Sequence, residues 1–451
     1  MNVLTAARAQ MEVSLAFHMV FAAVGIAMPI LMLVAEDRAI RTGDPGARAL
    51  SRRMARVTAL LFAVGAVSGT ALSFELSLLW PGFMRVAGPA IGPAFALEGD
   101  AFFLEAIFLG LYLYGHKKLS PRAHWWTGVP VAVSGLLSGA FVVAVNAWMQ
   151  CPPEGTGVTA EGLVSPSPWA PFLSPAWVNM AVHSTLACTA SVGFAVAGVA
   201  AAALRRGDTR PHHPHALRIG MGMAAVSALA QLVSGDFIAK MVARTQPVKL
   251  AAMEAHFETA RGAAVVLGGV VDSAEGRVHH AVTVPKVLSV LAFGDPAAEV
   301  RGLNSFDRAL WPNVNIVHIA FDVMVGCGSV MALVALVWGW FSWRGRGSGA
   351  ALPRWVLSCI VWASPLGFVA LEAGWIVTEA GRQPWVIQGL LRTRDAVTRE
   401  PSAALTFWGF SLLYLGLGVA VVLLLRWFGR AEVSDHHGDA ATEGELRDGH
   451  A

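Results

Sequence analysis

The sequence predicts an all-α fold, a polytopic bundle of membrane-spanning helices, and two observations support this class. The first is composition: of 451 residues, 55% are hydrophobic and only 14% are charged, with a mean hydropathy of +0.56. Because an ordinary soluble domain is about 25% charged, this chain lacks the polar surface that water requires. The second is a series of nine apolar runs, each close to the roughly 20 residues with which a helix crosses a bilayer.

The nine runs are predicted to be helices because backbone groups in lipid must pair within their own segment. They cover residues 11–35, 57–80, 95–114, 126–149, 178–204, 219–239, 314–341, 355–377 and 405–427. The first run is about 25 residues long, which is too long for the core of a signal peptide, so we expect a retained helix. No internal repeat is visible, which disfavours a transporter built from repeated halves. The four cysteines show no CxxC spacing, so neither a zinc site nor a disulfide framework is indicated.

The basic residues of the short loops predict the orientation in the membrane. Lysine and arginine concentrate in the first, third, fifth and seventh loops, whereas the second loop holds only Arg85 and the fourth holds none. Because basic loops stay in the cytoplasm, the N-terminus is expected outside and the C-terminus inside. The eighth loop disagrees, since it carries Arg382, Arg392, Arg394 and Arg399. We interpret these four arginines as paired or functional.

The chain divides into membrane-spanning and polar segments. Residues 1–240 hold the first six predicted helices, and residues 314–430 hold the last three. Between them, residues 241–313 form a long loop on the outer side. Residues 431–451 form a tail rich in Asp, Glu and His, which we expect to be disordered and cytoplasmic. The small net charge of +3, with basic residues in short clusters, fits membrane orientation and not nucleic-acid binding.

Several side chains in the apolar runs are costly to place in a membrane and are therefore candidates for function. They are His18, Glu75, Glu98, Glu105, His183, Glu372 and Glu379, to which Met324 is added as a potential ligand. Taken singly, a membrane histidine is often an inter-helix hydrogen-bonding residue and a methionine is usually core. By the predicted orientation, however, five of them share the outer half of the bilayer, namely His18, Glu98, His183, Met324 and Glu379. A His and Met pair is an axial ligand set that raises the potential of a haem, so several haems near one face would explain the cluster.

Glu98 and Glu105 are seven residues apart, so they share a helix face at a separation of roughly 10 Å. Carboxylates placed in this way can pass protons inward from the cytoplasmic side. The same spacing is common on soluble helices, so it indicates a proton route only together with the membrane setting.

Several motifs resemble subunit I of the cytochrome bd-type quinol oxidases. Residues 374–385, Gly-Trp-Ile-Val-Thr-Glu-Ala-Gly-Arg-Gln-Pro-Trp, match that family's GWxxxExGRQPW signature. Residues 146–150, Asn-Ala-Trp-Met-Gln, resemble its N-x-W-M-Q element, and residues 98–105 resemble its paired-glutamate helix. Residues 182–184 and 324–326 match its segments that supply haem ligands, and 249–254 resembles its quinol-loop element. The resemblance extends from about residue 8 to residue 427.

The resemblance implies a set of cofactors and the residues that hold them. His183 and Met324 would ligate a low-spin haem b. His18, Glu98 and Glu379 would serve a high-spin haem b and a haem d, and which of the three ligates which iron stays open. A further haem b in place of haem d also stays open.

The resemblance also implies contacts around the haems and the quinol. Trp375 and Arg382 would contact a haem ring and a propionate. Lys249 and Glu254 would bind quinol, although a separation of five residues puts them about 140° apart on a helix. Glu105, together with Glu75, would belong to the proton route or to the electrostatics of the haem site.

The implied reaction is electrogenic quinol oxidation coupled to oxygen reduction in a bacterial cytoplasmic membrane. Quinol, either ubiquinol or menaquinol, would release its protons outside, and oxygen would be reduced to water with protons from the cytoplasm, without a pump. A second membrane subunit and small accessory subunits are the implied partners. The outer loop is short for the family, as in its short-loop members, and Asp322 stands where many members carry Arg.

Two other classes of protein remain as alternatives. One is a quinone-linked cytochrome b anchor of a dehydrogenase, which would account for the His and Met but not for the GRQPW segment. The other is a proton-coupled transporter without a redox cofactor. A reduced-minus-oxidised absorption spectrum separates all three classes.

Overall fold

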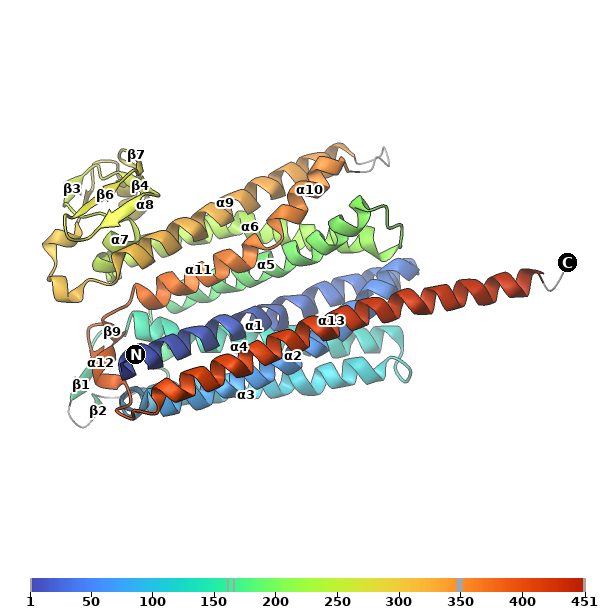
Figure 1. Cartoon of the computed structure of the whole chain (residues 1–451), viewed down its shortest axis with the longest axis horizontal. Coiled ribbons are helices and arrows are strands. Elements are labelled where there is room, and N and C mark those ends of the chain that lie inside the picture. The colour runs from blue at the N-terminus through green and yellow to red at the C-terminus, as the bar shows by residue number, and fades with distance from the viewer. Residues whose placement is uncertain (1, 160–161, 165–166, 346–351, 449–451) are drawn as a thin grey trace.

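A computed structural model describes residues 2–159, 162–164, 167–345 and 352–448, and most of them are helical. The long helices are α1 (Val3–Thr42), α2 (Pro45–Leu79), α3 (Pro81–Gly115), α4 (Pro121–Gln150), α5 (Trp177–Arg205), α6 (His212–Thr245), α9 (Val314–Arg344), α10 (Arg354–Ala363), α11 (Leu366–Ala380) and α13 (Ala403–Asp448). In Figure 1 they run side by side along the long axis of the molecule. Helices α1 to α4 form one group, α5, α6 and α9 to α11 form a second, and α13 packs along α1.

Each of the nine predicted runs lies in a helix, and eight helical segments of the described chain are long and apolar enough to cross a membrane. The run 95–114 lies in α3, which carries Glu98, Asp100 and Glu105 and is not among those eight. The eighth run is divided into α10 and α11. Pro365 at this point has no amide hydrogen for the helical ladder, which accounts for the break.

Tight turns between helices follow from local sequence. Asn2 caps α1 by accepting a hydrogen bond from the Thr5 amide at 2.7 Å, and α1 ends at Gly43, whose φ of 70° favours glycine. Asp44 then accepts hydrogen bonds from the first amides of α2. Asp44 thus satisfies helix amides that would otherwise be unpaired, and this stabilises the connection of Gly43 and Asp44 between α1 and α2.

The connections divide between the two ends of the bundle. Figure 1 shows the C-terminal ends of α1, α3, α5 and α9, near which basic residues concentrate, at one end of the bundle, together with the end of α13. The N-terminus and all the strands lie at the other end. The predicted odd and even loops are therefore on opposite ends of the molecule, which is the arrangement that the basic residues require.

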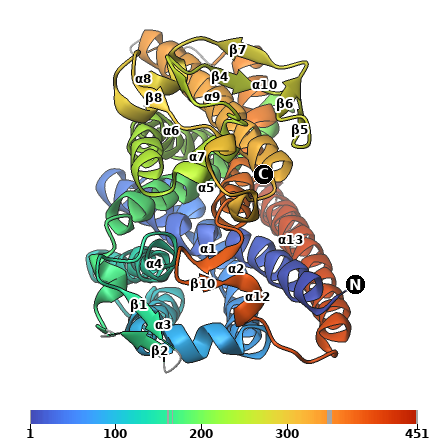
Figure 2. The same cartoon turned by 90° about the vertical axis from the view of Figure 1, so that its left-hand side faces the viewer.

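The long loop between α6 and α9 is a small folded unit, seen at the upper left of Figure 1 and the top of Figure 2. It begins at Gln246, a few residues after the predicted start at 241, because α6 continues to Thr245. It contains the helices α7 (Pro247–Met253) and α8 (Val287–Phe293) and the antiparallel pairs β3–β8 (Ala260–Arg261, Glu299–Val300), β4–β7 (Val265–Leu267, Val282–Val284) and β5–β6 (Val270–Asp272, Arg277–His279). Its core, which includes Leu250, Leu288 and Leu303, continues onto Val317 of α9. The loop is thus anchored on the helix bundle.

The remaining elements are short and close the same end. The pair β1–β2 (Gly157–Thr159, Gly162–Val164) lies between α4 and α5, and β9–β10 (Trp385–Ile387, Leu391–Arg392) and α12 (Thr393–Ala396) lie between α11 and α13. Three 3₁₀ turns cover Ala170–Leu173, Leu303–Ser305 and Arg308–Leu310. Helix α13 continues to Asp448.

Candidate functional site

A dense cluster of buried polar groups lies where the end of α11 meets the end of α4. Glu379 accepts hydrogen bonds from Asn146 Nδ2, at 2.6 Å, and from Arg382. Arg382 is only 4% exposed, and within the described residues its Nε and Nη1 have no hydrogen-bond partner. Leaving donors of a buried guanidinium unsatisfied is costly. The arrangement therefore fits a second anionic group, such as the carboxylate of a haem propionate.

Lys249 of α7 reaches into the same cluster. Its ammonium group donates hydrogen bonds to Gln150 Oε1 at 3.1 Å and to the Thr378 carbonyl at 3.2 Å. The side chain is 6% exposed, and this burial lowers the pKa of Lys249 to about 7, with a further decrease from Arg382 and an opposing effect of Glu379. Lys249 is therefore a proton donor and acceptor near neutral pH.

The two most specific sequence motifs thus meet in space. Asn146 and Gln150 are one turn apart at the end of α4, and they bind Glu379 and the Thr378 carbonyl of the segment 374–385. Trp148 between them is fully buried. The resemblance identified both motifs, but not that the first donates hydrogen bonds to the second.

Glu254 directly follows α7 and is also buried, with 4% of its surface exposed. Within the described chain its Oε2 has no hydrogen-bond partner. Burial raises the pKa of Glu254 to about 8, with a smaller contribution from Asp322 on α9. Neither Lys249 nor Glu254 is a solvated surface residue.

His18 on α1 has a defined ring orientation. Ser68 Oγ of α2 lies 2.9 Å from His18 Nδ1 and donates its own hydrogen to the Gly65 carbonyl at 3.1 Å. Since the serine has one hydrogen to donate, Nδ1 must be the donor to it, and the lone pair is left on Nε2. Gly69 allows this close approach, because a Cβ there would lie 3.0 Å from His18 Cε1. A histidine held in this way is suited to ligate a metal through Nε2.

His183 on α5 is held in a similar way by α6. Its Nδ1 lies 3.1 Å from Ser234 Oγ, and its Nε2 lies 3.0 Å from Gln231 Nε2, which can only donate. Nε2 therefore carries the lone pair, and ligation through it requires Gln231 to move. Neither Ser234 nor Gln231 was predicted as a site residue, because a polar residue in an apolar run gives no sign of which side chain it binds.

Met324 lies on α9, against α11. A Cβ added at Gly374 would lie only 3.1 Å from Met324 Sδ, so the glycine lets the thioether pack closely on the helix that bears Trp375. Helices α5, α6, α9 and α11 pack on one another. His183 and Met324 contact different neighbours in this arrangement, so their common ligation of one iron stays a prediction.

The buried carboxylates of the first helix group have few partners. Glu105 is 4% exposed, and its Oε1 has no hydrogen-bond partner among the described residues. It lies between α1 and α4, where Cβ atoms added at Gly25 and Gly135 would lie 3.6 and 3.4 Å from its two oxygens. Glu98, two turns away on the same helix, is half-buried. Glu75 of α2 is fully buried, and its Oε1 lies 3.5 Å from the Tyr414 hydroxyl.

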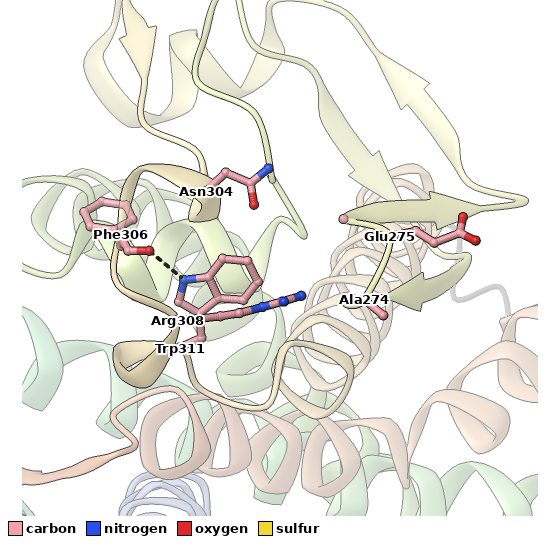
Figure 3. Close-up of a pocket in the computed structure, with 7 residues that line it drawn as sticks. Ala274, Glu275, Asn304, Phe306, Arg308 and Trp311 are labelled. Atoms are coloured by element: carbon pink, nitrogen blue, oxygen red, sulfur yellow. Dashed lines mark hydrogen bonds between the residues drawn. The ribbon is translucent and has the colours of Figure 1, made fainter.

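A cavity of about 350 Å³ in the outer loop contains none of the predicted site residues. Figure 3 shows it between the β5–β6 turn and the segment 304–311. The polar groups in its wall are bound locally, since Trp311 Nε1 donates to the Phe306 carbonyl at 3.3 Å and Arg308 donates to the Ser273 carbonyl. It is not the centre of the site.

The fold and the site define a class, a polytopic membrane protein with buried, partly unsatisfied polar groups between its helices. Comparison with known proteins identifies the family. Residues 6–433 match the family model of the cytochrome bd terminal oxidase subunit I. A putative cytochrome bd menaquinol oxidase subunit I of Bacillus subtilis is 33% identical over 439 residues, covering 96% of this chain and 98% of the relative. The cytochrome bd-II ubiquinol oxidase subunit 1 of Escherichia coli is 26% identical over 515 residues, covering 98% and 99%.

A solved structure agrees with the sequence relatives. The bd oxidase from Geobacillus thermodenitrificans matches with a TM-score of 0.87 and 34% identity, over 95% of this chain and 99% of that one. The chain therefore belongs to the cytochrome bd terminal oxidase subunit I family. It is a haem-bearing, multi-pass subunit of a quinol oxidase of the bacterial cytoplasmic membrane, and it acts with a second subunit.

Proposed function

We propose that this subunit oxidises quinol at the strand-bearing end of the bundle, outside the cell, and reduces oxygen to water with protons from the arginine-rich, cytoplasmic end. The observation that carries the proposal is the buried contact of Lys249, from the outer loop, with the segment that contains Glu379 and Arg382. It puts a proton-exchanging side chain beside a guanidinium suited to a haem propionate. Quinol and haem would then be close neighbours.

At the quinol, Lys249 would fix one oxygen by a hydrogen bond and Glu254 would accept a hydroxyl proton. Quinol loses two electrons and two protons on oxidation to quinone. A carboxyl with a pKa of about 8 is partly ionised at neutral pH, so it can accept a proton and release it to the outside again. Both quinol types, ubiquinol and menaquinol, have the hydroxyl groups that this chemistry needs.

The residues suited to hold haem lie in two sets. His183 and Met324 would ligate a low-spin haem b, and His18, Glu98 and Glu379 would serve a high-spin haem b and a haem d. The lone pair on Nε2 of both histidines and the unsatisfied donors of Arg382 support this assignment. Trp375 would contact a haem ring. The bound haems supply electron transfer and oxygen reduction.

Protons for water formation would come along α3. Glu105 is buried without a hydrogen-bond partner for Oε1, and Glu98 lies on the same face two turns nearer the outer end. Separating proton release outside from proton uptake inside generates a proton-motive force without a pump. Small accessory subunits would complete the complex.

The test is a reduced-minus-oxidised absorption spectrum of the purified complex, recorded with quinol-driven oxygen consumption. We expect haem b bands together with red-shifted haem d absorption, and turnover with quinol. Haem b alone without oxygen consumption would instead indicate an anchor subunit. Oxygen consumption with haem b bands only would mean that a further haem b replaces haem d.

A further inference from the structure

His318, in the second turn of α9, binds two separate parts of the outer loop. Its side chain is fully buried. Its Nδ1 lies 2.8 Å from the carbonyl oxygen of Met253, the last residue of α7. Its Nε2 lies 3.2 Å from the carbonyl oxygen of Gly268, which connects β4 to β5. One side chain of the helix bundle therefore joins two segments of the loop.

Both ring nitrogens of His318 must carry a hydrogen. A carbonyl oxygen can only accept a hydrogen bond, and each nitrogen faces one. The ring is therefore an imidazolium, and a buried positive charge needs a partner of opposite charge. Asp322, one turn further along α9, provides it, since its Oδ2 lies 3.6 Å from His318 Nε2.

Asp322 also binds the loop. Its Oδ2 accepts a hydrogen bond from the Gly268 amide at 2.6 Å, so both backbone groups of Gly268 are bound to α9. The φ of Gly268 is 65°, a left-handed conformation that favours glycine. A Cβ at this position would meet nothing within 4 Å, so backbone conformation and not crowding explains the glycine. This turn of the loop is thus held in a fixed conformation against α9.

The bond to Met253 acts directly on Glu254. The carbonyl that His318 binds belongs to the peptide bond between Met253 and Glu254, so it limits where the Glu254 carboxyl can lie. At the other end of α7, Lys249 is held by α4 and α11. Burial raises the pKa of Glu254, and the charge of Asp322 raises it further. The pair on α9 therefore acts on Glu254 both through the backbone and through charge.

We propose that His318 and Asp322 are positioning residues for quinol oxidation, which anchor the outer loop on α9 and hold the Glu254 carboxyl where it can accept a hydroxyl proton. A displacement of about 1 Å in a reacting group can cost about 100-fold in rate, so a fixed peptide bond beside Glu254 matters for turnover. This inference rests on the assignment of Glu254 to quinol in the proposed function.

The first test is quinol-driven oxygen consumption of the purified complex with His318→Leu, which removes both hydrogen bonds to the loop. We expect kcat for quinol to fall about tenfold or more, while KM stays close to the wild-type value because Lys249 still binds quinol. Haem spectra, and oxygen consumption with a donor that bypasses quinol, should stay normal. His318→Gln keeps one donor group and should recover part of the rate. His279→Gln is the matched control, because His279 is exposed in the same loop.

The second test, Asp322→Asn, removes the charge but keeps an acceptor oxygen. Since the charge of Asp322 raises the pKa of Glu254, its removal should lower that pKa. Glu254 is then ionised at lower pH, so the acid limb of the kcat profile should move to lower pH. The pKa of Lys249 depends on burial, Arg382 and Glu379. Its contribution therefore cancels in the ratio of the variant profile to the wild-type profile.

Two results would overturn the proposal while Glu254→Gln still slows quinol oxidation. One is a normal kcat in His318→Leu, and the other is an unshifted pH profile in Asp322→Asn. Normal turnover in Glu254→Gln would instead refute the quinol site itself, and this inference with it. Should His318→Leu fail to assemble with haem, the double variant His318→Leu/Asp322→Leu, which removes both buried charges together, takes its place in the kinetic test.

Discussion

Replacement of Lys249 by Met tests the proposed quinol site most directly. Methionine keeps much of the length and apolar stem of the side chain but removes the ammonium group that binds Gln150 Oε1 and the Thr378 carbonyl. A hydrogen bond from a charged donor contributes about 1.5–3 kcal/mol. Because about 1.36 kcal/mol corresponds to a factor of ten, kcat/KM for quinol should fall by about 10- to 150-fold at a pH where the ammonium is fully formed.

The pH dependence separates this effect from a loss of structure. The pKa of Lys249 is about 7, so the protonated fraction falls from about nine tenths at pH 6 to about one tenth at pH 8. The advantage of the wild type over Lys249→Met should therefore shrink about tenfold as the pH rises across this interval. The ratio of the two profiles cancels the contribution of Glu254, whose pKa of about 8 affects both proteins.

The assay is steady-state oxygen consumption at varied quinol concentration and pH, with haem content measured for every preparation. Lys240→Met is the control, because Lys240 pairs with Asp236 on α6 and lies outside the site. An artificial donor that bypasses quinol should drive both variants at the wild-type rate. A ratio that does not change between pH 6 and pH 8 would refute the role of the ammonium group.

Further predictions concern the haem ligands and the second quinol residue. Met324→Leu preserves volume but removes the thioether, so the low-spin haem should become high-spin or be lost, as an absorption spectrum would show. Replacement of His18, Glu98 or Glu379 by Ala should remove high-spin haem or abolish oxygen consumption, while the low-spin haem stays reducible. Glu254→Gln keeps the size but cannot accept a proton, so quinol oxidation should slow by about 100-fold or more, with both haem spectra intact.

Each of these outcomes has a clear contrary. An unchanged low-spin spectrum and midpoint potential in Met324→Leu would make Met324 a packing residue. Full oxygen turnover in all three alanine variants would remove the assignment of His18, Glu98 and Glu379. Normal quinol-driven turnover in Glu254→Gln would show that quinol binds elsewhere, provided that the subunit is present in the membrane at wild-type amounts.

The helices could be predicted from sequence because the membrane imposes long apolar segments. All nine runs are helical, with ends that differ by several residues where polar turns extend them, as at α1 and α6. The strands of the outer loop could not be predicted, since segments of two or three residues have no periodicity. Pro365 was a visible sign of the division between α10 and α11, which the hydropathy pattern conceals.

The candidate site was predictable residue by residue but not as an arrangement. Arg382 follows Glu379 by three residues, so their contact is local and can be expected from a helix end. Asn146 is 233 residues from Glu379, and no pattern within either segment indicates that they meet. Ser68 and Ser234 set the orientation of the two histidines, and only the packing of neighbouring helices reveals them.

The arginines of the eighth loop illustrate why counting charges predicts topology only approximately. Arg382 is buried against Glu379, and Arg392 lies 5.4 Å from the ring centroid of Trp385. The interpretation that these residues are paired is therefore confirmed for Arg382, whereas Arg392 contacts an aromatic ring. A basic residue that is bound within its own segment contributes to the local structure as well as to the charge of the loop. The C-terminal ends of α1, α3, α5 and α9, near which the basic residues of the odd loops lie, are at the opposite end of the bundle in Figure 1. If that end lies in the cytoplasm, only the eighth loop departs from the rule that basic loops are cytoplasmic. In the reverse orientation, the first, third, fifth and seventh loops would all depart from it.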